Sequence, residues 1–212
     1  ALYFDLEILM KNKIVFVVVS AKFLLSHRID VVLALKNKGW DITVVCPDGP
    51  HINTLFGFGL DVVTWNVARG GMNIFSCVTE LFRLGLILKR VQPEVVHLIS
   101  LKPFLLGGLC CYVFKVQSVV ISVTGLGFLG RHTDIRASLL RKCLSPFFRL
   151  AVSQRRKKII FQNSNDLDVM KVISGFSSSH ATIIRGSGIN LRACELRAEP
   201  EGTLVVTMAC RL

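Results

Sequence analysis

A histidine closes a short apolar segment that predicts a β-strand, and two polar residues follow that segment. His97 closes this segment, residues 94–99. An imidazole there can exchange a proton near neutral pH, or it can be a packed, hydrogen-bonded core residue. Ser100 and Lys102 come next, in a loop before a helix, where a lysine can reach a phosphate or lie exposed in solvent. His97 is therefore a candidate catalytic residue, and Ser100 and Lys102 are candidate binding residues.

A glycine-rich turn follows the apolar segment 118–124, which ends at Thr124. Gly125, Gly127 and Gly130 give the sequence GLGFLG. In dinucleotide-binding proteins this spacing follows the first strand, and an acidic residue ends the next strand. Neither holds here, which argues against an NAD-dependent oxidoreductase. The turn can still bring backbone N–H groups close to a ligand, so Thr124, Gly125 and Gly127 are candidate binding residues.

Polar residues also follow the first and last predicted strands of the sheet. Ser20 comes after the first, and His27 and Arg28 lie early in the next helix, where they contact a ligand or form a solvated pair. Gly186, Ser187 and Gly188 follow the last strand, where two glycines around a serine make either a turn or a hinge between domains.

Apolar, β-branched segments alternate with helical segments along most of the chain. The expected strands are residues 14–19, 42–46, 60–65, 94–99, 118–124, 158–162 and 181–184. The expected helices are residues 24–38, 74–91, 104–114, 136–156 (kinked at Pro146) and 166–173. Strands that are apolar throughout and alternate with helices indicate a parallel sheet covered on both faces. The predicted fold is α/β, a doubly wound, Rossmann-like sheet that binds ligands at the carboxyl ends of its strands.

Composition shifts divide the chain into four parts. Residues 1–10 are expected to be an upstream or non-native extension, because Met10 directly precedes a basic start and a strand. Residues 11–190 form the predicted Rossmann-like domain, and the polar residues 191–202 are the predicted linker. Residues 203–212 then read as the first strand of a truncated second domain, with Arg211 placed to meet a phosphate bound between the domains.

The chain is strongly basic, with a formal net charge of +12 that is concentrated in residues 131–158. Such a charge attracts phosphates. Because few aromatic residues are interleaved with these cations, an anionic membrane surface or a lipid-linked phosphate is favoured over nucleic acid. The seven cysteines have neither CxxC nor metal-ligand spacing, so no metal site is expected. Lys115 and Gln117 interrupt the most apolar stretch, so no membrane-spanning helix is expected.

Six segments, taken in order, resemble family 4 glycosyltransferases, which have two Rossmann-like domains facing each other in the GT-B fold. They are SHRIDVVLALKNKGWDITVVCP (26–47), PEVVHLISLKPFLLGG (93–108), SVTGLGFLG (122–130), KIIFQNSNDLDVM (158–170), IIRGSGINL (183–191) and LVVTMACRL (204–212). The match is closest to bacterial enzymes that extend lipid-linked surface polysaccharides. The resemblance implies transfer of a hexose or N-acetylhexosamine, with retention of anomeric configuration and without a metal or other cofactor, from a UDP-linked nucleotide-sugar. The implied acceptor is a polyprenyl-diphosphate-linked saccharide, at the cytoplasmic inner face of the plasma membrane.

The resemblance also assigns roles to single residues. His97 would lie near the transferred sugar, and an N-terminal domain of this family mainly holds the acceptor. The acceptor-binding residues would be Ser20, His27, Arg28, Ser100, Lys102, Thr124, Gly125 and Gly127. Gly186, Ser187 and Gly188 would form the joint between the domains, and Arg211 would contact the donor diphosphate.

Two departures from the family pattern limit what is expected of the chain. Ile99 stands where many members have a second histidine. The donor-binding domain is missing, so the chain alone is expected to be inactive. Two readings stay open: half of a glycosyltransferase, or a non-catalytic acceptor- and membrane-binding subunit of a split transferase with a separate donor domain.

Overall fold

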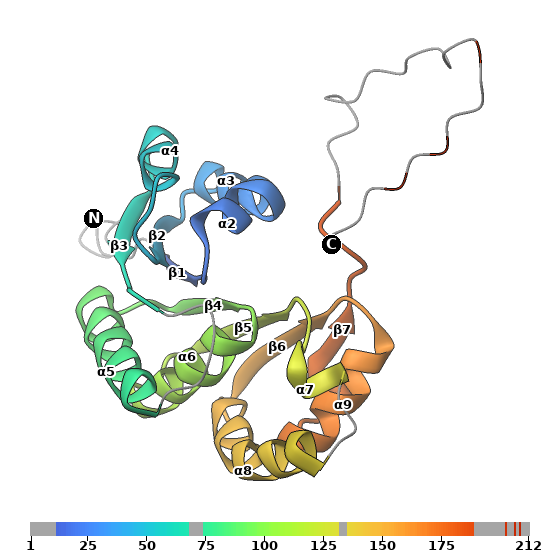
Figure 1. Ribbon diagram of the computed structural model, residues 1–212. Coiled ribbons are helices and arrows are strands. Elements are labelled where there is room, and N and C mark those ends of the chain that lie inside the picture. Colours follow the sequence, from blue (N-terminus) through green and yellow to red (C-terminus); the bar gives the residue numbers. More distant parts are fainter. Residues whose placement is uncertain are drawn as a thin grey trace.

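A parallel seven-stranded sheet forms the centre of the chain (Figure 1). The computed structural model describes residues 12–67, 74–131 and 135–188, together with residues 202, 206 and 208. The strands are β1 (Lys13–Val17), β2 (Asp41–Cys46), β3 (Asp61–Thr64), β4 (Val95–Ile99), β5 (Ser118–Val123), β6 (Arg156–Phe161) and β7 (Ala181–Ile183). They lie in the order β3-β2-β1-β4-β5-β6-β7, and every pair is parallel. The predicted α/β doubly wound fold is confirmed.

Helices pack on the two faces of this sheet (Figure 1). They are α2 (Ala21–His27), α3 (Ile29–Asn37), α4 (Ile52–Gly57), α5 (Ile74–Val91), α6 (Leu101–Val113), α7 (Phe128–Arg131), α8 (Ile135–Ala151) and α9 (Ser164–Ser174), with the 3-10 turn η1 (Ser178–His180). The apolar faces of α2, α3 and α4 join one core cluster, and those of α5, α6, α8 and α9 join the other. Successive side chains of a strand point to opposite faces of the sheet, so Val15 and Val17 of β1 pack in one cluster and Ile14 and Phe16 in the other.

Helix α6 lies close against its neighbours because two glycines remove side chains from its packing surface. A Cβ atom added to Gly108 would lie 2.7 Å from the Cβ of Ala151 in α8, closer than side chains approach one another. Gly107 faces Leu98 of β4 in the same way. This close approach fixes the start of α6 beside the end of β4, where Ser100 and Lys102 are found.

The order of the strands places a switch point between β1 and β4. From β1 the chain proceeds to β2 and β3 in one direction, and from β4 it proceeds to β5, β6 and β7 in the other. Loops that leave neighbouring strands at such a point turn toward opposite faces, which opens a crevice at the carboxyl ends of the strands. The segments around Ser20 and Ser100 leave β1 and β4 at this place.

The structure corrects three predictions about the elements. The single helix expected over residues 24–38 is divided at Arg28 into α2 and α3. The helix expected to reach residue 156 ends at Ala151, because the buried Gln154 donates from Nε2 to Gly108 O at 2.8 Å and fixes the connection. Strand β6 then begins at Arg156, which pairs with Ser118.

The prediction that both faces of the sheet are covered holds only in part. On β5 and β6 the side chains of Val119, Ile121 and Ile159 are buried under α6 and α8. Their neighbours on the other face, Val120 and Ile160, are partly exposed and belong to neither of the two core clusters. The expected extension 1–10, the linker 191–202, the final strand and Arg211 lie outside what the structure describes, apart from isolated residues.

Candidate functional site

His97 lies inside β4, two residues before the strand ends at Ile99, and not at the strand end as the sequence indicates. Its side chain is buried beside the ring of Phe16, with the ring centroids 5.1 Å apart. Its Nε2 atom lies 2.8 Å from Ser122 Oγ on β5. Burial, and then the charge of Arg28, lowers the pKa of His97 to about 4. The imidazole is therefore neutral at pH 7, and its polar edge is held by the hydroxyl of Ser122.

The ends of β4 and β5 are joined through two predicted site residues. Ser100 Oγ lies 3.3 Å from Thr124 Oγ1, and Ser100 N donates to Ser122 O at 2.9 Å. Ser100 also has φ of 85° and ψ of 167°, a conformation that side chains rarely adopt. Backbone strain of this kind costs of the order of 1–3 kcal/mol and is concentrated at functional sites. The turn from β4 into α6 is thus held in a defined but unfavourable shape.

Arg28 occupies the break between α2 and α3, with φ of −137° and ψ of −4°. The residue is half-buried, and its Nε atom is buried with no hydrogen-bond partner among the described residues. Burial lowers the pKa of the guanidinium, and its charge reaches the imidazole of His97. The structure therefore brings together Arg28 and His97, which are far apart in the sequence and were predicted to share a site.

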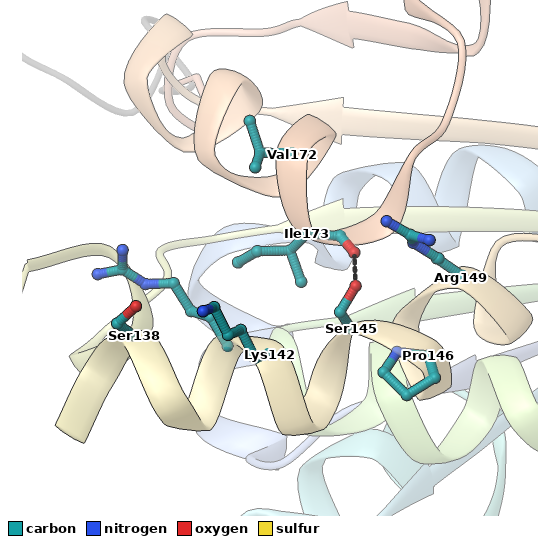
Figure 2. A pocket seen from close by; sticks show the side chains of 8 residues that line it. Ser138, Lys142, Ser145, Pro146, Arg149, Val172 and Ile173 are labelled. Carbon is teal, nitrogen blue, oxygen red and sulfur yellow. Dashed lines mark hydrogen bonds between the residues drawn. The ribbon is translucent and has the colours of Figure 1, made fainter. Parts of the chain in front are cut away.

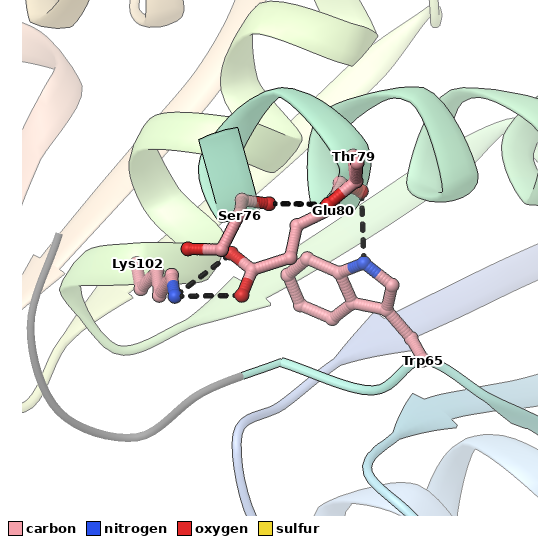
Figure 3. Close-up of polar contacts among 5 residues, drawn as sticks. All are labelled: Trp65, Ser76, Thr79, Glu80 and Lys102. Carbon is pink, nitrogen blue, oxygen red and sulfur yellow. Dashed lines mark hydrogen bonds and ion pairs between the residues drawn. The ribbon is translucent and has the colours of Figure 1, made fainter. Parts of the chain in front are cut away.

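Lys102 is held by an acidic residue that the sequence prediction missed. Its Nζ atom lies 2.8 Å from Oε2 and 3.0 Å from Oε1 of Glu80, on α5 (Figure 3). The Glu80 side chain is 5% exposed and that of Lys102 is 17% exposed. Trp65 Nε1 donates to the main-chain oxygen of Glu80 at 2.9 Å and so fixes the same turn of α5. A phosphate would bind Lys102 only by competing with the carboxylate of Glu80.

The other predicted acceptor-binding residues have local roles. Ser20 caps α2 by accepting from Phe23 N at 3.3 Å. His27 is exposed, stacks on the ring of Phe23 at 4.4 Å, and lies 2.6 Å from Ser26 Oγ through Nδ1. His27 therefore faces solvent at the end of α2, whereas Arg28 next to it is half-buried.

Glycines shape the turns after β5 and β7. Gly125 and Gly127 are exposed, with φ of 140° and 52°, and a Cβ atom at either would meet nothing within 4 Å. Glycine is needed there for the backbone conformation, since space is not limiting. After β7, Gly186 and Gly188 have φ of 70° and 77°. Ser187 between them has a buried Oγ with no hydrogen-bond partner in the described part of the chain.

Ser122 and Glu80 are the two site residues that the sequence prediction did not include. Ser122 lies on the same side of the sheet as His97, because His97 pairs with Val120 and side chains two residues apart share a face. A polar residue in the apolar segment 118–124 was the available signal. Glu80 is the only carboxylate that the sequence provides in the helix 74–91, but its partner could not be read from its position.

A basic groove lies away from this edge, between α8 and α9 (Figure 2). It has a volume of about 570 Å³ and is lined by Ser138, Arg141, Lys142, Ser145, Pro146, Arg149, Val172 and Ile173. Ser145 Oγ donates to Ile173 O at 2.7 Å and ties the two helices together. The lining includes three cationic side chains and no acidic one.

The described residues offer neither a metal-binding cluster nor a helix that could span a membrane. Within the residues that the structure describes, no three His, Cys, Asp or Glu side chains form a group that could hold a metal ion. Among the described helices, none has both the length and the hydropathy that crossing a bilayer requires.

The fold resembles that of several solved structures. A glycosyltransferase from Rickettsia africae matches with a TM-score of 0.59 and 14% identity, over 83% of this chain and 43% of that chain. The Anabaena protein HepE, solved with UDP and glucose, matches with a TM-score of 0.57 and 14% identity, over 85% of this chain and 46% of that one. A UDP-N-acetylglucosamine 2-epimerase from Rickettsia bellii gives a TM-score of 0.56 at 12% identity, over 84% and 45%. At these identities the likeness shows a shared fold.

Sequence comparison identifies a curated relative and a family. The relative, from Campylobacter jejuni, is named N,N'-diacetylbacillosaminyl-diphospho-undecaprenol alpha-1,3-N-acetylgalactosaminyltransferase. It is 24% identical over 165 residues, which are 78% of this chain and 43% of the relative. The chain thus spans less than half the length of that relative. Residues 13–163 match the family described as glycosyl transferase 4-like, which is well over half of the chain. The chain belongs to the glycosyl transferase 4-like family, as the resemblance predicted.

Proposed function

We propose that this chain is the acceptor-side part of a glycosyltransferase that extends a lipid-linked saccharide in surface polysaccharide synthesis. The family match over residues 13–163 supports sugar transfer, and the name of the Campylobacter jejuni relative supports a polyprenyl-diphosphate-linked acceptor. The sugar transferred would be a hexose or N-acetylhexosamine. It would come from a nucleotide-sugar, UDP-linked, with retention of configuration and without a metal or other cofactor.

The observation that carries this proposal is the meeting of polar groups at the carboxyl ends of β4 and β5, next to the switch point between β1 and β4. His97 and Ser122 lie 2.8 Å apart, and Ser100 and Thr124 lie 3.3 Å apart, on the neighbouring strands β4 and β5. Open α/β sheets bind their ligands at this place. A hydroxyl-lined edge with a neutral imidazole can hydrogen-bond the hydroxyls of a sugar, since both hydroxyls and neutral imidazole can donate and accept.

In the proposed complex, His97 lies near the transferred sugar and acts as a neutral hydrogen-bonding group. Its pKa of about 4 keeps it uncharged at pH 7, so it would not serve as a cationic acid there. The turn at Gly125 and Gly127 would approach the ligand with backbone N–H groups, because neither glycine presents a side chain.

The donor side of the reaction is proposed to need residues beyond this domain. Gly186, Ser187 and Gly188 would form the joint, and Arg211 would contact the donor diphosphate. The Oγ of Ser187 is buried without a hydrogen-bond partner among the described residues, as expected of a segment whose partner would lie in a second domain. The chain alone would therefore not bind a nucleotide-sugar tightly, and a separate donor domain could supply the missing contacts.

An anionic membrane surface is the proposed second partner, at the cytoplasmic inner face of the plasma membrane. On α8, Ile135 is 86% exposed and Leu139 is 62% exposed. The neighbouring groove of Figure 2 contributes Arg141, Lys142 and Arg149. Exposed apolar side chains beside cations are typical of helices that lie on anionic lipid. Nucleic acid is not a proposed partner.

The proposal can be tested by supplying a donor-binding domain. The 212-residue chain would be joined to the donor-binding part of the Campylobacter jejuni relative, and transfer from UDP-sugars to undecaprenyl-diphosphate-linked saccharides would be measured. Transfer is expected with the joined enzyme and is expected to fall at least about 100-fold in His97→Ala, an effect typical of an essential group near the reacting centre. His51→Ala, at the start of α4 where the side chain makes no capping hydrogen bond, is the matched control and should retain most of the rate.

Different outcomes separate the alternatives. If no UDP-sugar supports transfer although the joined protein is folded, the proposed activity is wrong. If the lipid-linked acceptor binds but His97→Ala leaves transfer unchanged, the chain is better described as a non-catalytic subunit that presents the acceptor. Tight binding of a UDP-sugar by the 212-residue chain alone would contradict the proposed division between acceptor and donor sides.

A further inference from the structure

Arg28 is a cation at the ligand-binding edge, and its Nε–H finds no hydrogen-bond partner among the described residues. It directly precedes α3, and it is half-buried. The Nε atom is buried without a hydrogen-bond partner, and no ion pair to this guanidinium is present in the described part of the chain. Buried charged groups are almost always paired, because removal from water is costly. An arginine in this state is suited to binding an anion.

The surroundings of Arg28 favour negative charge. Helix α3 begins at Ile29, so the positive end of its dipole lies beside the guanidinium. The imidazole of His97, which Arg28 reaches electrostatically, is neutral at pH 7 and does not compensate the charge. Asp30, in the first turn of α3, is exposed to solvent. An anion that enters from the carboxyl edge would meet a positive potential near Arg28.

The two other predicted basic residues of this edge already have partners. Lys102 is ion-paired with Glu80 at 2.8 Å. His27 stacks on Phe23 and faces solvent. Arg28 also has the geometry that suits a phosphoryl group, because a guanidinium presents two parallel N–H donors to two oxygens, whereas an ammonium acts as a point charge.

We infer that Arg28 binds a phosphoryl group of a diphosphate, at the carboxyl ends of β1 and β4 next to His97. This inference rests on the proposed function for the identity of the diphosphate, which is carried either by the nucleotide-sugar or by the polyprenyl-linked acceptor. Phosphoryl oxygens would accept from Nε and one terminal N–H of Arg28. The bound group would then bring the lipid- or nucleotide-linked sugar to the Ser100, Thr124 and His97 cluster.

The inference can be tested on the 212-residue chain by NMR, with inorganic pyrophosphate as the probe. Addition of pyrophosphate is expected to shift the Arg28 Nε–H resonance with saturation, and to raise the pKa of His97, because the anion offsets the charge of Arg28. In Arg28→Gln the affinity for pyrophosphate is expected to fall by at least about tenfold, the effect of losing one charge-assisted contact. Arg83→Gln, at an exposed arginine of α5, is the matched control and should bind as the unchanged chain does.

Two outcomes would overturn the inference. One is the absence of any saturable shift of the Arg28 Nε–H resonance or of the His97 pKa when pyrophosphate is added to the unchanged chain. The other is an Arg28→Gln variant that binds pyrophosphate as tightly as Arg83→Gln. If amide hydrogen exchange shows that Arg28→Gln is not folded, Arg28→Lys is used in its place. Lysine keeps the charge and loses the paired N–H donors. Arg28→Lys is then expected to bind several-fold more weakly than the unchanged chain, and equal affinity would overturn the inference.

Two further probes distinguish the sources of the diphosphate. UDP reports the nucleotide source, and farnesyl diphosphate reports the prenyl source. Arg28-dependent binding of farnesyl diphosphate with the higher affinity assigns the site to the acceptor, and the reverse order assigns it to the donor. If either binds through Arg28 while the joined enzyme transfers no sugar, the proposed function fails and the phosphoryl site remains. If transfer occurs but neither binds through Arg28, the site is wrong and the function remains.

Discussion

Two cations near the same edge of the sheet have opposite environments. Lys102, at the start of α6, is neutralised by Glu80 within a framework that includes Trp65 (Figure 3). Arg28, between α2 and α3, has a buried Nε atom and no partner among the described residues. The difference teaches that a cation at a ligand edge is not by itself a binding residue. The structure satisfies one charge internally and leaves the other available.

Breaking the satisfied pair should have the largest effect on stability. Glu80→Ala leaves Lys102 partly buried without its counter-charge, and the free energy of unfolding should fall by about 3 kcal/mol, the order found when one partner of a buried pair is removed. Urea unfolding followed by circular dichroism measures this change. The double variant Glu80→Leu with Lys102→Met removes both charges and should recover most of the loss. A single variant within about 0.5 kcal/mol of the unchanged chain would show that the pair is not a structural element.

Lowering the pH should destabilise the folded chain through protonation of the buried His97. Its pKa is about 4 in the folded chain and about 6.5 when unfolded, so the unfolded state binds more protons between these values. Stability from the neutral imidazole is therefore fully present above pH 6.5 and is lost as the pH falls toward 4, by roughly 3 kcal/mol in total. Comparing urea unfolding of the unchanged chain and of His97→Gln at pH 7 and pH 4 tests this. Equal pH dependence in the two proteins would contradict it.

The strained turn at Ser100, before Lys102, should respond in the opposite direction. Ser100 has φ of 85°, which glycine adopts freely. Ser100→Gly should raise the free energy of unfolding by about 1 kcal/mol, reduced by loss of the contact to Thr124. Ser100→Ala loses that contact and keeps the strain, so it should be less stable than the glycine variant. A glycine variant no more stable than the alanine variant would argue against strain at this turn.

The unsatisfied cation should be the most tolerant of substitution. Arg28→Gln removes a charge that has no counter-charge in the described residues, so the free energy of unfolding should change by less than about 0.5 kcal/mol. Urea unfolding in the absence of phosphate measures this. A loss as large as that of Glu80→Ala would show that Arg28 is paired in solution, and the contrast between the two regions would disappear.

The sheet could be predicted from sequence because each strand is a continuous apolar segment bounded by turn residues. The break between α2 and α3 could not be predicted, because the residue at the break is Arg28 and not glycine or proline, which usually interrupt a helix. The exposure of Val120 and Ile160 could not be predicted either. Both residues are apolar, like their buried neighbours, although they are partly exposed.

The candidate site was predicted in part for a related reason. Ser100 and Thr124 follow directly after strands, whose carboxyl ends the parallel sheet brings to one edge, whereas His97 lies two residues inside β4. Glu80 and Ser122 depend on which helix lies beside α6 and on the register of β4 against β5, and neither is encoded in local spacing. Only the packed structure shows that Lys102 is paired with Glu80, whereas Arg28 has no ion-pair partner among the described residues.

The most direct test of this account is the stabilisation that pyrophosphate gives to three proteins: the unchanged chain, Arg28→Gln and Lys102→Met. A ligand that binds the folded state at a concentration 100-fold above its Kd raises the free energy of unfolding by about 2.7 kcal/mol. At one pyrophosphate concentration, chosen to saturate the unchanged chain, the unchanged chain and Lys102→Met should gain the same increment, and Arg28→Gln should gain at least about 1.4 kcal/mol less. An increment that survives in Arg28→Gln and disappears in Lys102→Met would contradict the account.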